Sequence, residues 1–316
     1  MEISKCILLT GAGFTHNFGG FLGEEMWTEI FNHPEIQKRQ FVRELMLDDN
    51  DHDYESVYNK ILWDSKYEYL SKTDKEAVRN AVYDAYLRNE KKTANGILSI
   101  YRIQEFIMRF QGDNNSHGFF FTLNQDLFIE RTYLGSRKQL TLPWVKKITG
   151  LTGDGGDEDF IRLPSEDEVK SLSLISLNME EFHYVKLHGS LNWRSCHGQN
   201  MMVIGGNKKE QIDREPLLKR YYEIFENVLS VGDRKLMVIG YGFRDEHIND
   251  TIINAIKEKG LKLYVLSPKN PHAFIKRVAP EIANGLYGYF AYNLFQTCKE
   301  SADYFHNTMD ERFFRI

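Results

Sequence analysis

Five short apolar runs, each followed at once by a glycine-bearing or polar loop, constrain the fold of this chain more than any other feature. Most of them lack the strict alternation of a half-exposed strand, and this is typical of strands buried on both faces of a parallel sheet. The runs are Cys6–Leu9, Phe119–Phe121, Tyr184–Leu187, Leu236–Ile239 and Leu261–Leu266.

Amphipathic patterns between these runs predict the connecting helices. Asp245 is predicted to be the N-cap of one helix, and Gly260 ends that helix where a left-handed residue is favoured. Thr73 and Glu76 form a candidate capping box for another. Strands that alternate with helices predict βαβ units and an α/β fold with a doubly wound, mostly parallel sheet.

Two stretches interrupt this alternation and predict insertions. Residues from about 32 to 111 have mostly helical patterns, which predict a helical insertion after the first βα unit. Residues from about 139 to 182 contain the glycine- and aspartate-rich segment Gly150–Asp157, which predicts a loop-rich insertion. The acidic spacing is not that of an EF-hand. We therefore expect one domain over residues 1–316 with two insertions.

Charge and cysteine content exclude several functional classes. The net charge of −5 argues against general nucleic-acid binding, which depends on Lys and Arg side chains that neutralise phosphates. The three cysteines, Cys6, Cys196 and Cys298, contain no CxxC pair and therefore predict neither a disulfide framework nor a zinc ribbon. No apolar run is long enough for a signal peptide or a membrane helix, so we expect a cytoplasmic protein without membrane contacts.

The first candidate site is the segment Gly11-Ala12-Gly13-Phe14-Thr15-His16, directly after the opening strand. Glycines there let a backbone approach a pyrophosphate, and the next helix offers its N-terminus to negative charge. The match to G-x-G-x-x-G fails because His16 replaces the third glycine. A tight structural turn remains as good an explanation as a phosphate cradle.

Two further strand ends carry polar residues. Asn124 and Asp126 follow the second run, and either could project into a crevice or serve as an ordinary turn residue. His188 and Gly189 follow the third run. A histidine at a strand tip is a candidate general base, because its ordinary pKa of about 6.5 suits proton transfer near neutral pH.

The last two runs end in a similar way. Gly240 and Gly242 flank a turn that leads to the helix beginning near Asp245, and Ser267 follows the final run. The two glycines could surround ribose and phosphate, or simply form a βα turn. In an open α/β sheet, ligands bind in the crevice outside the carboxyl ends of the strands, so these positions together predict a site.

In their order and spacing these motifs resemble those of sirtuins, which carry a G-A-G-x-S/T start, a T-x-N-x-D segment and an H-G pair. The sequence is most similar to sirtuin-like NADases of bacterial anti-phage defence, which share K-L-H-G-S-x-N-W and G-Y-G-F-x-D-x-H-I-N. Here these motifs are Lys186–Trp193 and Gly240–Asn249. The resemblance covers the sheet from Ile3 to about Pro268 and implies a Rossmann-like fold, without covering the insertions.

The resemblance implies a set of residue roles around NAD, which would be bound as the substrate. Asn124 would position the ribose hydroxyls or the attacking water, Asp126 would orient that group, and His188 would be the base. The nucleotide-binding set would comprise Gly11, Ala12, Gly13, Phe14, Thr15, Gly240, Gly242, Asp245 and Ser267.

The sequence departs from deacetylating sirtuins at the zinc module. In the region after the His-Gly pair where four zinc-binding cysteines would stand, the sequence has only Cys196, so no metal is expected. This favours an NAD+ glycohydrolase that releases nicotinamide and ADP-ribose. A zinc-less protein deacylase or ADP-ribosyltransferase remains an alternative, and so does a non-catalytic subunit that senses NAD or ADP-ribose.

By the same resemblance we expect a triggered effector of anti-phage defence. Control by homo-oligomerisation or by a partner ATPase of the HerA type would limit damage to the host cell. No direct sequence-specific contact with nucleic acid is expected.

Overall fold

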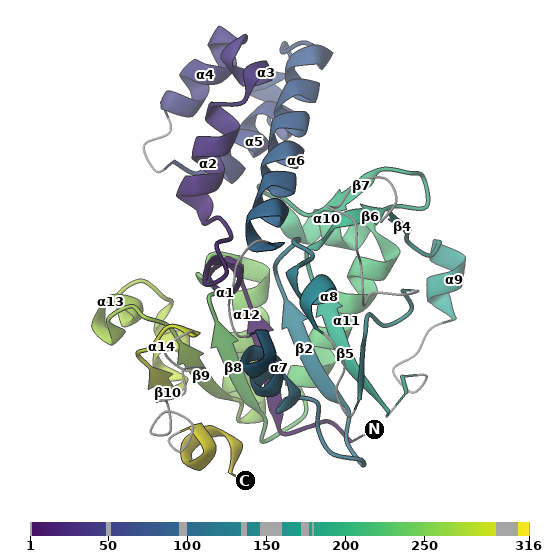
Figure 1. Ribbon diagram of the computed structural model, residues 1–316, viewed down its shortest axis with the longest axis vertical. Coiled ribbons are helices and arrows are strands. Elements are labelled where there is room, and N and C mark those ends of the chain that lie inside the picture. Colours follow the sequence, from purple (N-terminus) through teal and green to yellow (C-terminus); the bar gives the residue numbers. More distant parts are fainter. Residues whose placement is uncertain are drawn as a thin grey trace.

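A parallel sheet of seven strands, in the order β10-β9-β8-β1-β2-β5-β3, forms the centre of the computed structural model (Figure 1). The structure describes residues 2–48, 52–94, 100–133, 138–145, 160–171, 177–178, 180–294 and 309–315. The predicted glycine-rich segment 150–157 lies outside these residues. The strands are β1 (Cys6–Thr10), β2 (Gly118–Thr122), β3 (Gln139–Thr141), β5 (Glu181–Lys186), β8 (Lys235–Ile239), β9 (Lys262–Leu266) and β10 (Leu286–Phe290).

The chain winds in both directions from β1, so the strand order reverses between β1 and β8. Helices cover both faces of the sheet. In Figure 1, α7 (Ile100–Met108) and α8 (Phe128–Thr132) lie on one face, and α11 (Pro216–Leu229) and α12 (Glu246–Lys259) lie on the other. The predicted doubly wound, Rossmann-like α/β fold is confirmed.

The central strands end at the same level. Thr10 at the end of β1 pairs in register with Thr122 of β2 on one side and with Ile239 of β8 on the other. Thr122 in turn pairs with Lys186 of β5. Because these strands are parallel, the loops that follow them begin side by side at one edge of the sheet.

A group of helices stands over this carboxyl edge (Figure 1). It has its own hydrophobic cluster, which includes Ile36, Ile61 and Val78, and Leu191 and Ile204 from beyond β5 join it. The helices are α2 (Gly23–Phe31), α3 (Pro34–Gln37), α4 (Gln40–Leu47), α5 (Tyr54–Trp63), η1 (Ser65–Tyr67) and α6 (Lys72–Ala94). By contrast, α7 contributes to the hydrophobic core around the sheet. We call α2–α6 the helical unit.

Smaller elements complete the described fold. A second sheet has the order β4-β6-β7, and it adjoins the end of β5. The remaining elements are α1 (Ala12–His16), β4 (Ile161–Arg162), α9 (Glu166–Lys170), β6 (Gly189–Arg194), β7 (Asn200–Met202), α10 (Lys208–Arg214), α13 (Pro271–Ile275), α14 (Pro280–Asn284) and η4 (Asp310–Phe314). None of the described helices is both long and apolar enough to span a bilayer.

The local predictions have mixed outcomes. The five apolar runs lie in β1, β2, β5, β8 and β9, which confirms them, and Gly260 ends α12 with a φ of 70° as expected. The predicted capping box is wrong, because α6 begins at Lys72 and Thr73 already lies inside it. The box is instead Ser71 with Asp74. The Asp74 N–H donates to Ser71 Oγ at 3.1 Å, and the Ser71 N–H donates to Asp74 Oδ2 at 3.2 Å.

Candidate functional site

The candidate site is at the carboxyl edge of the sheet, around the strand-order reversal between β1 and β8. In open α/β proteins, ligands bind outside the carboxyl edge of the sheet at such a reversal. Every predicted site residue follows β1, β2, β5, β8 or β9 at this edge. The contacts of the polar residues among them form two clusters.

The glycines after β1 and β8 allow these two loops to pack backbone against backbone. The Gly13 N–H donates to Gly240 O at 2.9 Å, and the Gly11 N–H donates to Ile239 O at 3.0 Å. A Cβ on Gly240, whose φ is 68°, would lie 2.1 Å from the Phe14 backbone nitrogen. On Gly11 or Gly13 a Cβ would lie 2.8 Å from backbone atoms of the other loop. Mutual packing therefore accounts for these three glycines.

Gly242 and Ala12 are different. A Cβ on Gly242 would meet only Arg244 Cγ at 3.7 Å, which is an ordinary contact. Ala12 is exposed at the start of α1, beside the half-buried Gly13. Packing therefore does not require a glycine at position 242, and Ala12 is open to solvent.

The first cluster, which we call the amide cluster, comprises Thr15, Asn124 and Asp126. Asn124 Nδ2 donates to Thr15 Oγ1 at 2.7 Å and to Gly11 O at 3.1 Å. The Thr15 hydroxyl, with its lone pair engaged by Asn124, donates to Asp126 Oδ2 at 2.8 Å. The three groups thus form a directional chain, and such chains strengthen each bond by mutual polarisation.

The amide cluster leaves one acceptor available. Within the described part of the chain, no group donates to Asn124 Oδ1. Asp126 is more fully engaged, because its Oδ1 accepts from the Phe128 N–H at 3.1 Å. The carbonyl of Asn124 is therefore held in place with a lone pair that a bound hydroxyl or water can use.

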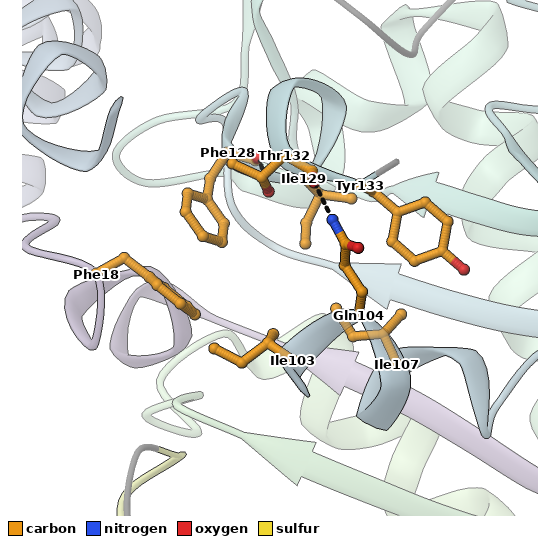
Figure 2. Close-up of a pocket in the computed structure, with 8 residues that line it drawn as sticks. All are labelled: Phe18, Ile103, Gln104, Ile107, Phe128, Ile129, Thr132 and Tyr133. Carbon is orange, nitrogen blue, oxygen red and sulfur yellow. Dashed lines mark hydrogen bonds between the residues drawn. The ribbon is translucent and has the colours of Figure 1, made fainter. Parts of the chain in front are cut away.

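The Phe14 side chain is not part of the amide cluster. Its ring is buried and contacts the rings of Phe18, Phe120 and Phe128, with centroids 5.6 to 6.4 Å apart. Figure 2 shows the neighbouring pocket between α7 and α8, where Gln104 donates to the carbonyl of Thr132 among apolar side chains. The predicted site residues do not line this pocket, which is an apolar gap in the packing behind Phe14.

The second cluster, which we call the histidine cluster, begins with His188. Its Nε2 lies 3.1 Å from Nε2 of His247, the second residue of α12. Burial lowers the pKa of His188 to about 3 and that of His247 to about 4, although Asp245 opposes both shifts. Both imidazoles are therefore neutral at neutral pH, and the ordinary pKa expected for His188 from the sequence is wrong because the ring is buried.

Asp245 occupies the N-cap position of α12, but its side chain does not cap the helix. Its Oδ1 instead pairs with Lys208 Nζ at 2.7 Å. Lys208 also pairs with Glu55 Oε2, at 2.7 Å, and Glu55 belongs to α5 of the helical unit. Burial would raise the pKa of Asp245, but His188 and Lys208 outweigh it and hold that pKa below its usual value. One lysine thus links the sheet edge to the helical unit.

Residues 118–285 of this chain match the SIR2-like domain family. The chain belongs to this family. The matched region contains Asn124, Asp126, His188 and Asp245, whereas the β1 turn and the helical unit lie outside it. No match to a curated protein was found. Membership relates the chain to the sirtuin-type, NAD-dependent proteins.

The loops that carry the two clusters of this SIR2-like domain are bonded to each other. The carbonyl of Gln125, between Asn124 and Asp126, accepts from the Leu191 N–H at 2.8 Å. Gln125 Nε2 donates to Val203 O at 3.0 Å, and the Val203 N–H donates to His188 O at 2.9 Å. Gln125 therefore couples the segment after β2 to the segment after β5.

The helical unit also contacts the loop of the amide cluster, through one face of α6. Tyr86 donates to Gln125 Oε1 at 3.2 Å, and Glu90 Oε1 accepts from the Leu127 N–H at 2.6 Å. Glu90 Oε2 pairs with Arg131 at 2.7 Å. Burial and the nearby Asp126 raise the pKa of Glu90 to about 8 against the effect of Arg131. The sequence analysis assigned no role to these α6 residues, because their partners lie about 40 positions away.

A buried ion pair also contacts the amide cluster. Lys186, at the end of β5, donates to the carbonyl of Asp126 and pairs with Glu130 at 2.7 Å. Lys186 and Glu130 are almost completely buried. Ser267 is separate from both clusters: its N–H donates to Phe290 O, and its Oγ accepts from the Lys269 N–H.

Among the described residues, no group of three or more His, Cys, Asp or Glu side chains is arranged to hold a metal ion. Cys196 is half-buried, and Cys6 is buried in the sheet, where burial raises the pKa of its thiol to about 11.

Proposed function

We propose that this SIR2-like protein is an NAD+ glycohydrolase that converts NAD to nicotinamide and ADP-ribose. The observation that carries the proposal is the hydrogen-bonded chain Thr15–Asn124–Asp126 at the carboxyl edge of a SIR2-like protein, next to the strand-order reversal. It holds a carbonyl acceptor at the position where such folds bind nucleotides. The roles assigned below to individual residues are part of this proposal.

The chemistry needs orientation more than a strong nucleophile. The bond between nicotinamide nitrogen and ribose C1′ breaks, and its electron pair leaves with nicotinamide, which becomes neutral. A water oxygen then bonds to C1′ and loses a proton. The ribose passes through an oxocarbenium-like state, so the enzyme gains most by holding the water and the sugar in place.

The amide cluster supplies that orientation. Asn124 Oδ1 accepts a hydrogen bond from a ribose hydroxyl or from the attacking water, because its amide nitrogen is already committed to Thr15 and Gly11. Thr15 keeps the amide from rotating, and Asp126 keeps the Thr15 hydroxyl in its donor orientation. The exposed turn at Ala12 and Gly13, with Gly242 nearby, approaches the phosphates.

His188 takes the proton from water or from a ribose hydroxyl. It is neutral in this structure, as a base must be, since burial lowers its pKa to about 3. Such a buried imidazole is a weak base until substrate charge or movement changes its surroundings.

The site is closed in this structure, which supports a triggered enzyme. The exposed fractions are 3% for Thr15, 7% for Asn124, 6% for Asp126 and 2% for His188. NAD reaches these groups only if the segments over the carboxyl edge move. We propose that an assembly of this chain, or a partner such as an ATPase, provides that movement in a cytoplasmic anti-phage response.

The decisive experiment incubates the purified protein with NAD and measures nicotinamide and ADP-ribose. We expect Asn124→Ala and His188→Ala each to lower nicotinamide release by roughly 10²–10⁴-fold with folding unchanged, which is the usual contribution of a positioned acid–base group. Asn32→Ala and His272→Ala are matched controls, because both residues are exposed and lie outside the clusters.

Other outcomes distinguish the alternatives. Nicotinamide that appears only when an acylated peptide is added would indicate a deacylase. Label transferred from NAD to protein would indicate an ADP-ribosyltransferase, and NAD binding without any nicotinamide would indicate a sensor. Unchanged activity in both the Asn124 and His188 variants would contradict the proposed roles.

A further inference from the structure

The imidazole rings of His188 and His247 contact each other through their Nε2 atoms. The two Nε2 atoms are 3.1 Å apart, and the ring centroids are 5.3 Å apart with an angle of 38° between the planes. At this distance one nitrogen carries a proton and the other offers a lone pair. The direction of this bond decides which nitrogen of His188 is left to accept a proton.

Burial decides the direction. His188 is almost completely buried, and in the described part of the chain no group bonds to its Nδ1. A proton on Nδ1 would have no acceptor among the described residues and, in a residue that is 2% exposed, little contact with water, so the single proton of neutral His188 belongs on Nε2, where His247 accepts it. His247 is only half-buried, so it can keep its own proton on Nδ1 and direct it to solvent.

We propose that His247 is a positioning residue: it accepts the Nε2–H of His188 and so leaves Nδ1 of His188 as the nitrogen that takes a proton. The catalytic consequence rests on the proposed NAD+ hydrolysis, but the proton arrangement does not. When Nδ1 accepts a proton, the resulting cation still donates from Nε2 to His247, and the carboxylate of Asp245 lies near enough to stabilise its charge.

The backbone of His247 is well held for this role. Its carbonyl accepts from Tyr222 OH at 2.8 Å and from Thr251 Oγ1 at 3.1 Å. The preceding turn is tightened by Tyr241, which receives the Asp245 N–H at 3.1 Å and donates to Asn249 Oδ1 at 3.0 Å. The ring therefore projects from a rigid first turn of α12, where it can hold one orientation of His188.

The position of the proton on the His188 ring can be measured directly. Nitrogen NMR of protein with labelled histidine, near pH 7.5, distinguishes a protonated from a bare imidazole nitrogen, and His188→Gln identifies the His188 signals. We expect wild type to show a protonated Nε2 and a bare Nδ1 on His188. His247→Gln, which keeps an acceptor, should retain this pattern, whereas His247→Leu should give a mixture of both tautomers. His272→Gln changes an exposed histidine outside both clusters and serves as the control.

Kinetics then test the catalytic consequence. In His247→Leu we expect kcat for nicotinamide release to fall by roughly tenfold to a hundredfold, less than on loss of His188 itself, with KM within about twofold. His247→Gln should restore most of kcat. A plain structural role would not give this split between kcat and KM, nor rescue by glutamine.

The failures are distinguishable. A proton on Nδ1 of His188 in the wild type overturns the proposal, and this measurement needs neither turnover nor a stable leucine variant. An unchanged kcat in His247→Leu also overturns it. If the expected tautomer is present but no nicotinamide is released under any condition, the proposed function fails and the positioning by His247 stands.

Discussion

The two clusters at the carboxyl edge are built on different principles. The amide cluster joins Thr15, Asn124 and Asp126, and its internal bonds run from an amide through a hydroxyl to a carboxylate. The histidine cluster combines two imidazoles with ionic groups from separate segments, including Asp245 and Lys208. The first uses residues of two neighbouring loops, whereas the second extends to Glu55 in the helical unit.

The difference teaches which part of the site is vulnerable. Hydrogen bonds between uncharged donors and nearby acceptors keep their contribution to stability when a distant helix moves. Charges buried together depend on every partner, because removal of one leaves the others unpaired in a poor solvent. The histidine cluster is therefore the part most sensitive to the helical unit, to pH and to mutation.

The largest expected effect comes from Lys208→Met. This change leaves Glu55 and Asp245 facing each other without the shared cation, and breaking a buried pair costs about 3–5 kcal/mol. Denaturant unfolding should show this loss. Lys257→Met is the control, since the side chains of Lys257 and its partner Glu281 are 51% and 41% exposed and loss of this pair should cost under about 0.5 kcal/mol. Equal stabilities of the two variants would remove the contrast between the clusters.

Gly240→Ala should lower the free energy of unfolding by about 3 kcal/mol. The new Cβ adds a left-handed strain at φ 68° to a 2.1 Å clash with the Phe14 nitrogen. It would separate the loops after β1 and β8 and so affect both clusters. Gly242→Ala should leave stability nearly unchanged, because its nearest contact is at 3.7 Å. A fall in NAD affinity in Gly242→Ala alone would sharpen the assignment of Gly242 to the nucleotide.

The pH dependence of the free energy of unfolding should distinguish the two clusters. The pKa of His188 is lowered to about 3 by burial, below the ordinary value of about 6.5 in the unfolded chain. The unfolded state therefore binds the extra proton first, and stability is lost as pH falls below about 6.5, by up to about 1.4 kcal/mol per pH unit. Thermal unfolding between pH 6.5 and 5 should show a shallower dependence in His188→Gln.

A matched variant in the amide cluster gives the contrast. Thr15→Val removes a hydroxyl that does not titrate, so it should lower stability without changing the slope over the same range. His183, which is also buried with a pKa lowered to about 3, contributes to the slope in every variant. If Thr15→Val and His188→Gln had the same slope, the proposed difference in electrostatics would be wrong.

The smallest effect is expected from Tyr86→Phe, which tests whether the amide cluster is independent of the helical unit. The change removes a bond to Gln125 and one to Tyr54, so unfolding should lose about 1 kcal/mol. Nicotinamide release should fall by less than roughly tenfold, because the bonds within the amide cluster remain. A fall as large as that of Asn124→Ala would show that the amide cluster also depends on the helical unit.

The accuracy of the sequence analysis follows the range of the interactions. The apolar runs predicted five strands correctly, because burial on both faces leaves a local pattern. They missed the two edge strands of the central sheet: β3, which has only three residues, and β10, whose residues Leu286–Phe290 are partly exposed and interrupted by Gly288. The capping box was displaced by two residues, since several nearby side chains had the right chemistry for a cap.

The candidate site shows the same limit. Asn124, Asp126 and His188 attract attention because each follows a strand directly. His247 stands in the motif after β8, yet nothing local shows that its ring meets His188, which is 59 positions away. Lys208 and Glu55 look like ordinary surface charges in the sequence, and only their burial beside Asp245 distinguishes them.

The amino-acid sequence by itself determined five strands of the central sheet, that these strands are parallel, and which polar residues stand at their ends. These properties depend on neighbours along the chain, so they leave a local trace. Only the tertiary structure decided that Gly11 and Gly13 pack against Gly240, that Asp245 binds a lysine instead of capping its helix, and that the His188 imidazole is neutral. Desolvation and charge pairing act through space, and the sequence does not state which distant residues meet.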